Sequence, residues 1–183
     1  MNYKNLNKSE KEYYLALFAE KAEISYRAKD YKSCIGYLNR IIMLSEKVSP
    51  DIYHIIASCY RNVADYEKAI ENMNNAMILS ERVSQFQLIE RGISYFGLGK
   101  IELAMCDLID GLKGEIFHPE GYRVLGQCFD YYGDIYNTMK FIMTAALQGD
   151  LNAKKYIINL CGNYNEDEYN VLLRQENRII NLN

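Results

Sequence analysis

The sequence has no tryptophan, only two prolines and only two histidines among its 183 residues. Proline interrupts helices and strands, so its scarcity leaves long stretches free to form regular structure. No uninterrupted apolar run approaches the roughly 18 residues that a membrane-spanning helix needs, and we expect no membrane insertion. The first residues, MNYKNLNKSEKEYY, contain neither an apolar signal core nor a small-residue cleavage site. These absences favour a cytoplasmic protein.

Cysteine usage and charge exclude further classes. The five cysteines are widely separated and include no C-x-x-C pair that could hold zinc or act as a redox site. We therefore expect buried, reduced thiols. The net charge is −3, and lysine and arginine are scattered along the chain. A nucleic-acid partner would require a clustered basic face, so we expect none.

The chain offers little raw material for catalysis. His54 and His118 lie far apart in the sequence, and neither belongs to an H-E-x-x-H pair. His118, next to a proline, is expected to lie in a loop or to cap a helix. No glycine-rich phosphate loop occurs, and the acidic run Glu166, Asp167, Glu168 is interpreted as a helix cap. We expect no catalytic residues, no metal site and no cofactor, which is to say that the protein is not an enzyme.

What the sequence does contain is helical periodicity and an internal repeat. Apolar residues recur at spacings of three and four, as in Ile35, Leu38 and Ile42, which is typical of amphipathic helices. Four segments also resemble one another, namely AKDYKSCI, VADYEKAI, GLGKIELA and YYGDIYNT. Their marker residues Asp30, Asp65, Lys100 and Asp134 lie 35, 35 and 34 positions apart. A fixed period of this length predicts stacked structural units.

Each unit has small residues where two helices can approach closely. They are Ala57, Gly92 and Gly126 in the first halves of the units, and Ala69 and Ala104 in the second halves. Pro50 and Pro119 stand at the first position of a unit, where a helix tolerates the missing N–H. Both patterns favour units made of two helices.

In these features the chain resembles the tetratricopeptide repeat, a unit of about 34 residues that folds as two antiparallel helices. The resemblance implies an all-α, right-handed α-solenoid of antiparallel helix pairs, with about four to five repeats. Repeats are expected at about 15–48, 50–83, 85–118 and 119–151, followed by a degenerate or capping repeat at 152–183. The units depart from the family pattern in lacking tryptophan and in having Lys21 and Arg91 where leucine is usual.

The resemblance implies that the first helices of the pairs line a concave groove that binds a peptide or a helix of a partner protein. We therefore expect a non-catalytic protein–protein interaction module, such as an adaptor, a chaperone or a regulatory scaffold. The alternative is a structural or assembly protein that acts through its convex face or through self-association as a homo-oligomer. The carboxylate clamp of heat-shock co-chaperones has no counterpart in either frame of the repeat.

The groove positions of the repeat are the second, fifth, ninth, twelfth and thirteenth residues of each unit. In the first unit they are Ala16, Ala19, Glu23, Tyr26 and Arg27. The residues expected to contact a partner are Tyr26, His54, Arg61, Asn62, Phe86, Ile89, Ile93, Phe96, Arg123, Gln127, Asp130 and Tyr131. Four of them form an apolar stripe, Phe86, Ile89, Ile93 and Phe96. The stripe either forms a pocket between Arg61 and Arg123 or belongs to the core, and the sequence leaves both open.

Overall fold

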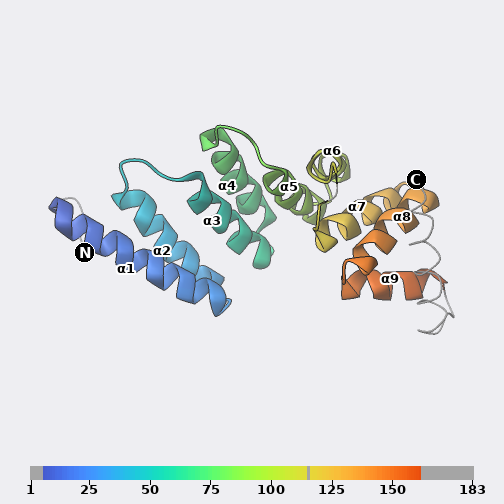
Figure 1. The fold of residues 1–183 in the computed structure, drawn as a ribbon, viewed down its shortest axis with the longest axis horizontal. Helices are drawn as coiled ribbons and strands as arrows, with labels where there is room; N and C mark the ends of the chain where they lie inside the picture. Colours follow the sequence, from blue (N-terminus) through green and yellow to red (C-terminus); the bar gives the residue numbers. More distant parts are fainter. Residues whose placement is uncertain (1–5, 115, 162–183) are drawn as a thin grey trace.

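The computed structural model describes residues 6–114 and 116–161 of the chain. These residues form nine α-helices, and no strand occurs among them. In chain order the helices are α1 (Lys8–Arg27), α2 (Tyr31–Leu44), α3 (Pro50–Asn62), α4 (Tyr66–Leu79), α5 (Gln85–Gly97), α6 (Ile101–Gly111), α7 (Pro119–Tyr131), α8 (Ile135–Leu147) and α9 (Leu151–Cys161). Figure 1 shows them as an elongated row of hairpins. The predicted α-solenoid of antiparallel helix pairs is confirmed.

One helix pair lies in each of the ranges 50–83, 85–118 and 119–151, and the first helix of the chain begins before residue 15. Helix α1 starts at Lys8 rather than near residue 15 because Asn7 and Glu10 form a capping box. The Asn7 side chain accepts the Glu10 N–H at 2.9 Å, and the Glu10 carboxylate accepts the Asn7 N–H at 2.8 Å. Helix α9 lies in the first part of the range 152–183, where a degenerate or capping repeat is expected. The rest of that repeat, with the acidic run 166–168, lies outside the described residues.

The period in the sequence arises from a helix-capping residue that recurs in the repeat units. Asp30, Asp65 and Asp134 each precede the second helix of a pair, and each accepts the backbone N–H three residues later. A capping carboxylate satisfies a donor that the helix leaves open, and it also favours the positive end of the helix dipole. Lys100 occupies the same position before α6 and makes no side-chain cap.

The residue before each of these positions has a left-handed backbone. Its φ is 71° at Gly99 and 72° at Gly133, and it is 59° at both Lys29 and Ala64. Glycine adopts this conformation without cost, whereas other residues lose about 1–2 kcal/mol. The turn geometry is therefore the same in all four units, although only two of them have the residue that suits it.

The small residues lie where the paired helices meet, as predicted. A Cβ on Gly126 would lie 2.7 Å from Ile142 Cγ1, and one on Gly92 would lie 2.8 Å from Leu108 Cγ. The alanines expected at the other contacts, Ala57, Ala69 and Ala104, are buried. Contacts this close between helix axes require a side chain no larger than alanine on one side.

Arg91, which departs from the repeat pattern, joins three helices. Its guanidinium donates to both carboxylate oxygens of Asp107 on α6, at 2.7 and 2.9 Å, and to Asn74 Oδ1 on α4 at 2.8 Å. A bidentate pair of this kind fixes orientation as well as distance. Arg91 therefore replaces an apolar contact with a polar one inside the wall of the solenoid, away from the inner face.

The thiols are partly as predicted. Cys34, Cys59 and Cys128 are free and buried, and burial raises the pKa of the Cys128 thiol to about 12. Cys106 is exposed, which contradicts the expectation of burial, because it is not one of the residues that α6 buries, Ile101, Ala104, Asp107, Leu108 and Gly111. The Cys161 side chain lies outside the part of the structure that is described. Protonated, enclosed thiols act as small apolar side chains.

The odd-numbered helices form the inner face of the solenoid. Helix α3 contacts α5, and α5 contacts α7, whereas the even-numbered helices of the described chain do not approach one another as closely. A row of helix pairs curves toward the side on which its helices are closer together. The side chains that point inward from α1, α3, α5, α7 and α9 therefore share one surface.

Candidate functional site

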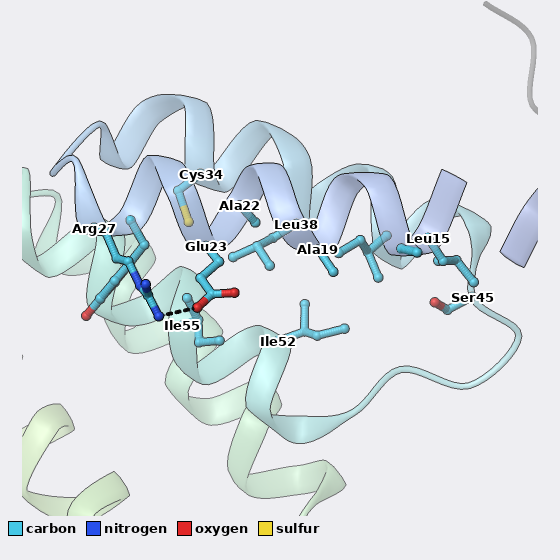
Figure 2. A pocket seen from close by; sticks show the side chains of 13 residues that line it. Leu15, Ala19, Ala22, Glu23, Arg27, Cys34, Leu38, Ser45, Ile52 and Ile55 are labelled. Carbon is cyan, nitrogen blue, oxygen red and sulfur yellow. Dashed lines mark hydrogen bonds and ion pairs between the residues drawn. The ribbon is translucent and has the colours of Figure 1, made fainter. Parts of the chain in front are cut away.

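A pocket of about 920 Å³ opens on the inner face at the N-terminal end, between α1, α2 and α3. We call it the N-terminal pocket, and Figure 2 shows it from close by. Its apolar lining includes Leu15, Ala19, Ala22, Leu38, Ile52 and Ile55. Helices α1 and α3 approach each other less closely than α5 and α7 do, and the alanines of α1 leave the resulting space unfilled.

The N-terminal pocket has a polar end formed by three residues of α1. Arg27 Nη2 pairs with Glu23 Oε1 at 2.5 Å, and the Tyr26 hydroxyl lies 3.2 Å from Ser58 Oγ on α3. All five groove positions predicted for the first unit line this pocket. The walls contributed by α2 and by Ile52 and Ile55 of α3 were not predicted, because their presence depends on the spacing between two units.

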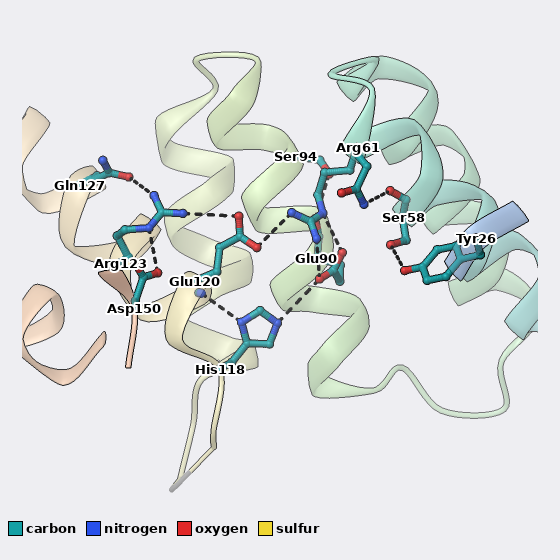
Figure 3. Close-up of polar contacts among 12 residues, drawn as sticks. Tyr26, Ser58, Arg61, Glu90, Ser94, His118, Glu120, Arg123, Gln127 and Asp150 are labelled. Carbon is teal, nitrogen blue, oxygen red and sulfur yellow. Dashed lines mark hydrogen bonds and ion pairs between the residues drawn. The ribbon is translucent and has the colours of Figure 1, made fainter. Parts of the chain in front are cut away.

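Charged side chains cross the middle of the inner face, as Figure 3 shows. Arg61 of α3 donates from Nε to Glu90 Oε2 of α5 at 2.9 Å, and from Nη1 to Glu120 Oε2 of α7 at 3.1 Å. Arg123 of α7 donates to Asp150 Oδ2 at 3.0 Å, and its Nη2 lies 3.4 Å from Glu120 Oε1. We call these five residues the central network.

The contacts within the central network stabilise the charged forms of Glu90 and Arg61. Burial would raise the pKa of the Glu90 carboxyl, but the His118 imidazole and the Arg61 guanidinium outweigh it and lower that pKa below its ordinary value of 4.5. Burial would likewise lower the pKa of Arg61, but Glu90 and Glu120 raise it. Each cation of the network is already paired within the fold, so the network is not a ready site for a free carboxylate.

His118 connects this network to the start of α7. Its Nδ1 accepts the Gly121 N–H at 3.0 Å and so caps the helix. A helix cap is one of the two roles that the sequence predicts for His118. Because Nδ1 accepts, the neutral ring carries its proton on Nε2, which lies 3.7 Å from Glu90 Oε1. That distance is longer than an ordinary hydrogen bond. The Phe86 ring lies 6.0 Å from the imidazole.

A smaller hollow of about 390 Å³ lies beside the central network. Its lining includes the charged residues Arg61, Glu120 and Arg123, together with Phe96 and Gly97 of α5. The sequence allows two interpretations of the apolar stripe, and one of them is a pocket between Arg61 and Arg123. The hollow is more polar than that reading assumed, because Glu120 lies between the arginines and pairs with both.

The apolar stripe itself divides between surface and core. Ile89 is fully buried and Ile93 is 6% exposed, whereas Phe86 is 53% exposed. The prediction that Ile89 faces a partner is therefore wrong. Ile93 is nearly buried and also lines the smaller hollow. The physical reason is a socket of two glycines, since a Cβ on Gly111 or on Gly121 would lie within 2.9 Å of Ile89.

The remaining predicted residues lie on the inner helices but not at one place. Asn62 is exposed and donates to Ser58 O at 2.8 Å, and His54 is half-buried on α3. Asp130 accepts the Tyr156 hydroxyl at 2.5 Å, and Tyr131 at the end of α7 is exposed. Gln127 accepts from Arg123 Nη1 at 3.0 Å, which attaches it to the central network.

Neither a metal site nor a membrane span emerges from the described residues. Over 6–114 and 116–161, no three histidine, cysteine or acidic side chains come together as metal ligands would. None of the helices in these ranges is both long enough and apolar enough to cross a bilayer.

Several solved structures have a similar fold. MamA from Desulfovibrio magneticus RS-1, from residue 41 to its end, superposes with a TM-score of 0.67 at 14% identity, over 92% of this chain and 94% of that one. YrrB, described as a TPR protein with an unusual peptide-binding site, has a TM-score of 0.65 at 10% identity, over 79% and 74%. The Arabidopsis OM64 TPR domain has a TM-score of 0.58 at 15% identity, over 66% and 98%. No protein-family model matches the sequence, and no curated protein matches it either.

Proposed function

We propose that this chain, which has the tetratricopeptide-repeat fold, is a protein-interaction module without a catalytic role that binds a peptide or helix of a partner on its inner face. The N-terminal pocket is its anchor point. The observation that carries the proposal is an apolar hollow of about 920 Å³ that the fold leaves open to solvent. YrrB, which shares the fold, is described as having a peptide-binding site, and this lends support by analogy.

The pocket is a better anchor than the central network. A partner gains about 25 cal/mol for each Å² of apolar surface that it buries, and Ile55, which is 39% exposed, offers such surface. A charged ligand at the central network would instead have to displace Glu90 or Glu120 from Arg61. Anchoring residues of protein interfaces are typically apolar or aromatic side chains that enter a pocket, as this site would allow.

One observation favours the alternative of a structural protein that self-associates. The turn between α7 and α8 exposes a group of large side chains, Tyr131, Tyr132, Ile135 and Tyr136. Contiguous exposed apolar surface often marks an interaction site. In that case assembly, rather than ligand binding, would be lost when this turn is changed.

A peptide-display selection on the intact protein tests the proposal. We expect the enriched peptides to bind the wild type and an Ile78→Asn variant equally, and to bind Ile55→Asn at least about tenfold more weakly. Ile78 is 79% exposed on α4 and provides the same substitution outside the pocket. Equal binding to both variants would contradict the proposed site.

Analytical ultracentrifugation of a Tyr136→Asp variant tests the alternative. If the chain is a structural protein that self-associates, this change should disperse an oligomer, and Ile55→Asn should not.

A further inference from the structure

Helix α1 has apolar side chains on two opposite faces. Phe18 and Ala22 are buried against the rest of the fold. On the other side of the helix, Tyr13 is 64% exposed and Ile24 is 60% exposed. Leu17 lies between these two on the same face, because residues three and four apart on a helix are neighbours. A surface helix ordinarily has one apolar stripe and a polar opposite face, so this second apolar row needs its own explanation.

The repeat register shows what covers the position of Ile24 in the later units. Ile24 stands six residues before Asp30, and the residues six before the other three markers are Cys59, Ser94 and Cys128. None of these three is more than 3% exposed. Cys59 lies in the same core cluster as Cys34 of the preceding unit. This position is therefore a contact between units, and in the first unit it is exposed.

The position of Leu17 is also a contact between units. Its counterparts in the third and fourth units are Gln87 and Gly121. Gln87 Nε2 donates to Ser80 Oγ at the end of α4 at 3.0 Å, and a Cβ on Gly121 would lie 3.4 Å from Leu112 Cδ2 at the end of α6. Helices α3, α5 and α7 each contact the second helix of the preceding pair. Among the described residues no helix precedes α1, which Figure 1 shows at one end of the row.

The exposed row has the spacing of a coiled-coil seam. Its positions follow one another at alternating steps of three and four, as Glu10, Tyr13, Leu17, Glu20, Ile24 and Arg27. We call these six residues the outer seam of α1. A mean step of 3.5 residues keeps a row of side chains facing a partner helix along its length. The outer seam is about 26 Å long at 1.5 Å per residue, so it suits a helix about as long as α1 itself.

The outer seam is complementary to a second copy of itself when the two helices run antiparallel. The layers that form are Tyr13 with Ile24, Leu17 with Glu20, and Glu10 with Arg27, each occurring twice. A parallel pair would instead set Glu10, Glu20 and Arg27 each against its own counterpart, and juxtaposed like charges oppose association. Arg27 is already paired with Glu23 in its own chain. The antiparallel direction therefore follows from avoided repulsion more than from a new ion pair.

We propose that the outer seam of α1 is the contact surface of a two-fold symmetric dimer, in which α1 packs antiparallel against α1 of a second copy. That helix takes the place that the second helix of a preceding unit has elsewhere in the solenoid. Because the surface pairs with itself, the assembly closes at two copies. The N-terminal pocket lies on another face of α1, with Leu15, Ala19 and Ala22, so the inference is independent of the proposed function.

Two features predict a weak dimer. A contact through one helix from each copy is small beside the about 1,200–2,000 Å² that stable interfaces bury. Glu20 also brings a charge into the central layers, and a polar residue in a seam fixes the register at a cost in stability. We therefore expect a dimer that forms at micromolar concentrations, and one that an apolar residue at position 20 would strengthen.

Sedimentation velocity of the full chain over a range of concentrations tests the dimer. The wild type should pass from monomer to dimer, and Ile24→Asp should weaken the association at least about tenfold, because it places a charge against Tyr13. Ile78→Asp changes an isoleucine of α4 that is 79% exposed, and it should associate as the wild type does. Glu20→Leu should tighten the dimer several-fold. Thermal midpoints of all variants check that the fold is retained.

Cysteine cross-linking tests the direction of the two helices. Cys106→Ser first removes an exposed native thiol. Proteins of this background that carry either Tyr13→Cys or Ile24→Cys are then mixed and oxidised with oxygen and a copper catalyst. Antiparallel helices should give mainly the mixed disulfide between the two proteins, whereas parallel helices would give the two symmetrical ones.

Three results would overturn the proposal. The first is a wild type that stays monomeric at every concentration. The second is an oligomer that survives Ile24→Asp, and if Tyr136→Asp disperses it instead, the contact lies at the turn between α7 and α8. The third is a predominance of symmetrical disulfides in the cross-linking. Binding of displayed peptides to the N-terminal pocket would be unaffected by any of them, so the proposed function is decided separately.

Discussion

Arg61 on α3 reaches past α5 to Glu120 on α7, with 3.1 Å between Nη1 and Oε2. The contact spans three successive units, whereas helix packing in a solenoid mostly joins neighbours. It is possible only because the odd-numbered helices converge on the inner face. The curvature of the solenoid is therefore held in part by a charge that several units share.

Removing Arg61 should destabilise the protein through the carboxylates that it leaves behind. Arg61→Met leaves Glu90 charged and mostly buried, and we expect a loss of about 2–4 kcal/mol in the free energy of unfolding. Arg61→Met/Glu90→Gln should recover part of this loss, because no unpaired charge remains. Urea unfolding of both variants and of Glu90→Gln gives the coupling energy. An additive result would contradict the role assigned to the pair.

The stability of the protein should depend on Glu90 in acid. Because the pKa of Glu90 is lowered in the folded state, the unfolded chain binds its proton first, and the stabilisation is lost as pH falls below about 4.5. Glu90→Gln should be less stable than the wild type at neutral pH, and the difference should narrow in acid. Chemical unfolding at a series of pH values measures this, and a difference independent of pH would count against it.

The turn geometry predicts substitutions that stabilise. Ala64→Gly should raise the free energy of unfolding by about 0.5–1 kcal/mol, because glycine relieves the left-handed strain at some cost in unfolded-state entropy. Gly99→Ala, at the same position of the next unit, should destabilise. Thermal unfolding of the two variants should move in opposite directions. A shift of the same sign in both would contradict the shared geometry.

The absence of a side-chain cap on α6 predicts a second substitution that should stabilise the protein. Lys100→Asp places a carboxylate where Asp65 and Asp134 cap the equivalent helices, and we expect about 1 kcal/mol of stabilisation. Lys100→Ala serves as the control, because it removes the cation without adding a cap. If alanine and aspartate raise the thermal midpoint equally, the benefit comes from the lost charge and not from a cap.

Burial of Ile89 reverses one expectation for the apolar stripe. Ile89→Ala should cost about 2–5 kcal/mol, since the residue is fully enclosed and its two glycine neighbours cannot fill the space. Phe86→Ala, at the exposed end of the stripe, should cost much less. Thermal or urea unfolding compares the two. Similar losses would place Phe86 in the core as well.

The repeat made much of the fold predictable, since the caps at Asp30, Asp65 and Asp134 and the small contact at Gly126 recur with the period. In the structure Tyr26, a groove position of the first unit, lines the N-terminal pocket. It failed at Ile89, because Gly111 and Gly121 belong to other helices and form the socket only after these pack together. The repeat pattern describes the residues within one unit, whereas the burial of a side chain also depends on its contacts with the next unit.

The N-terminal pocket also could not be predicted from the repeat pattern. Ala16, Ala19 and Ala22 were available as a signal of open space, but their neighbours on α3 could equally have closed it. Only the spacing between α1 and α3 decides this, and that spacing depends on how two units stack.

The most direct test of the central claim is methyl NMR of the full chain during titration with a bound helical peptide. We predict that the methyl signals of Ala19, Ile52 and Ile55 shift and saturate together, since these side chains line the N-terminal pocket. Signals from Ile78 and Ile135, which are exposed elsewhere, should remain unchanged. Shifts confined to Ile135 and its neighbours, with the pocket signals unmoved, would contradict the account.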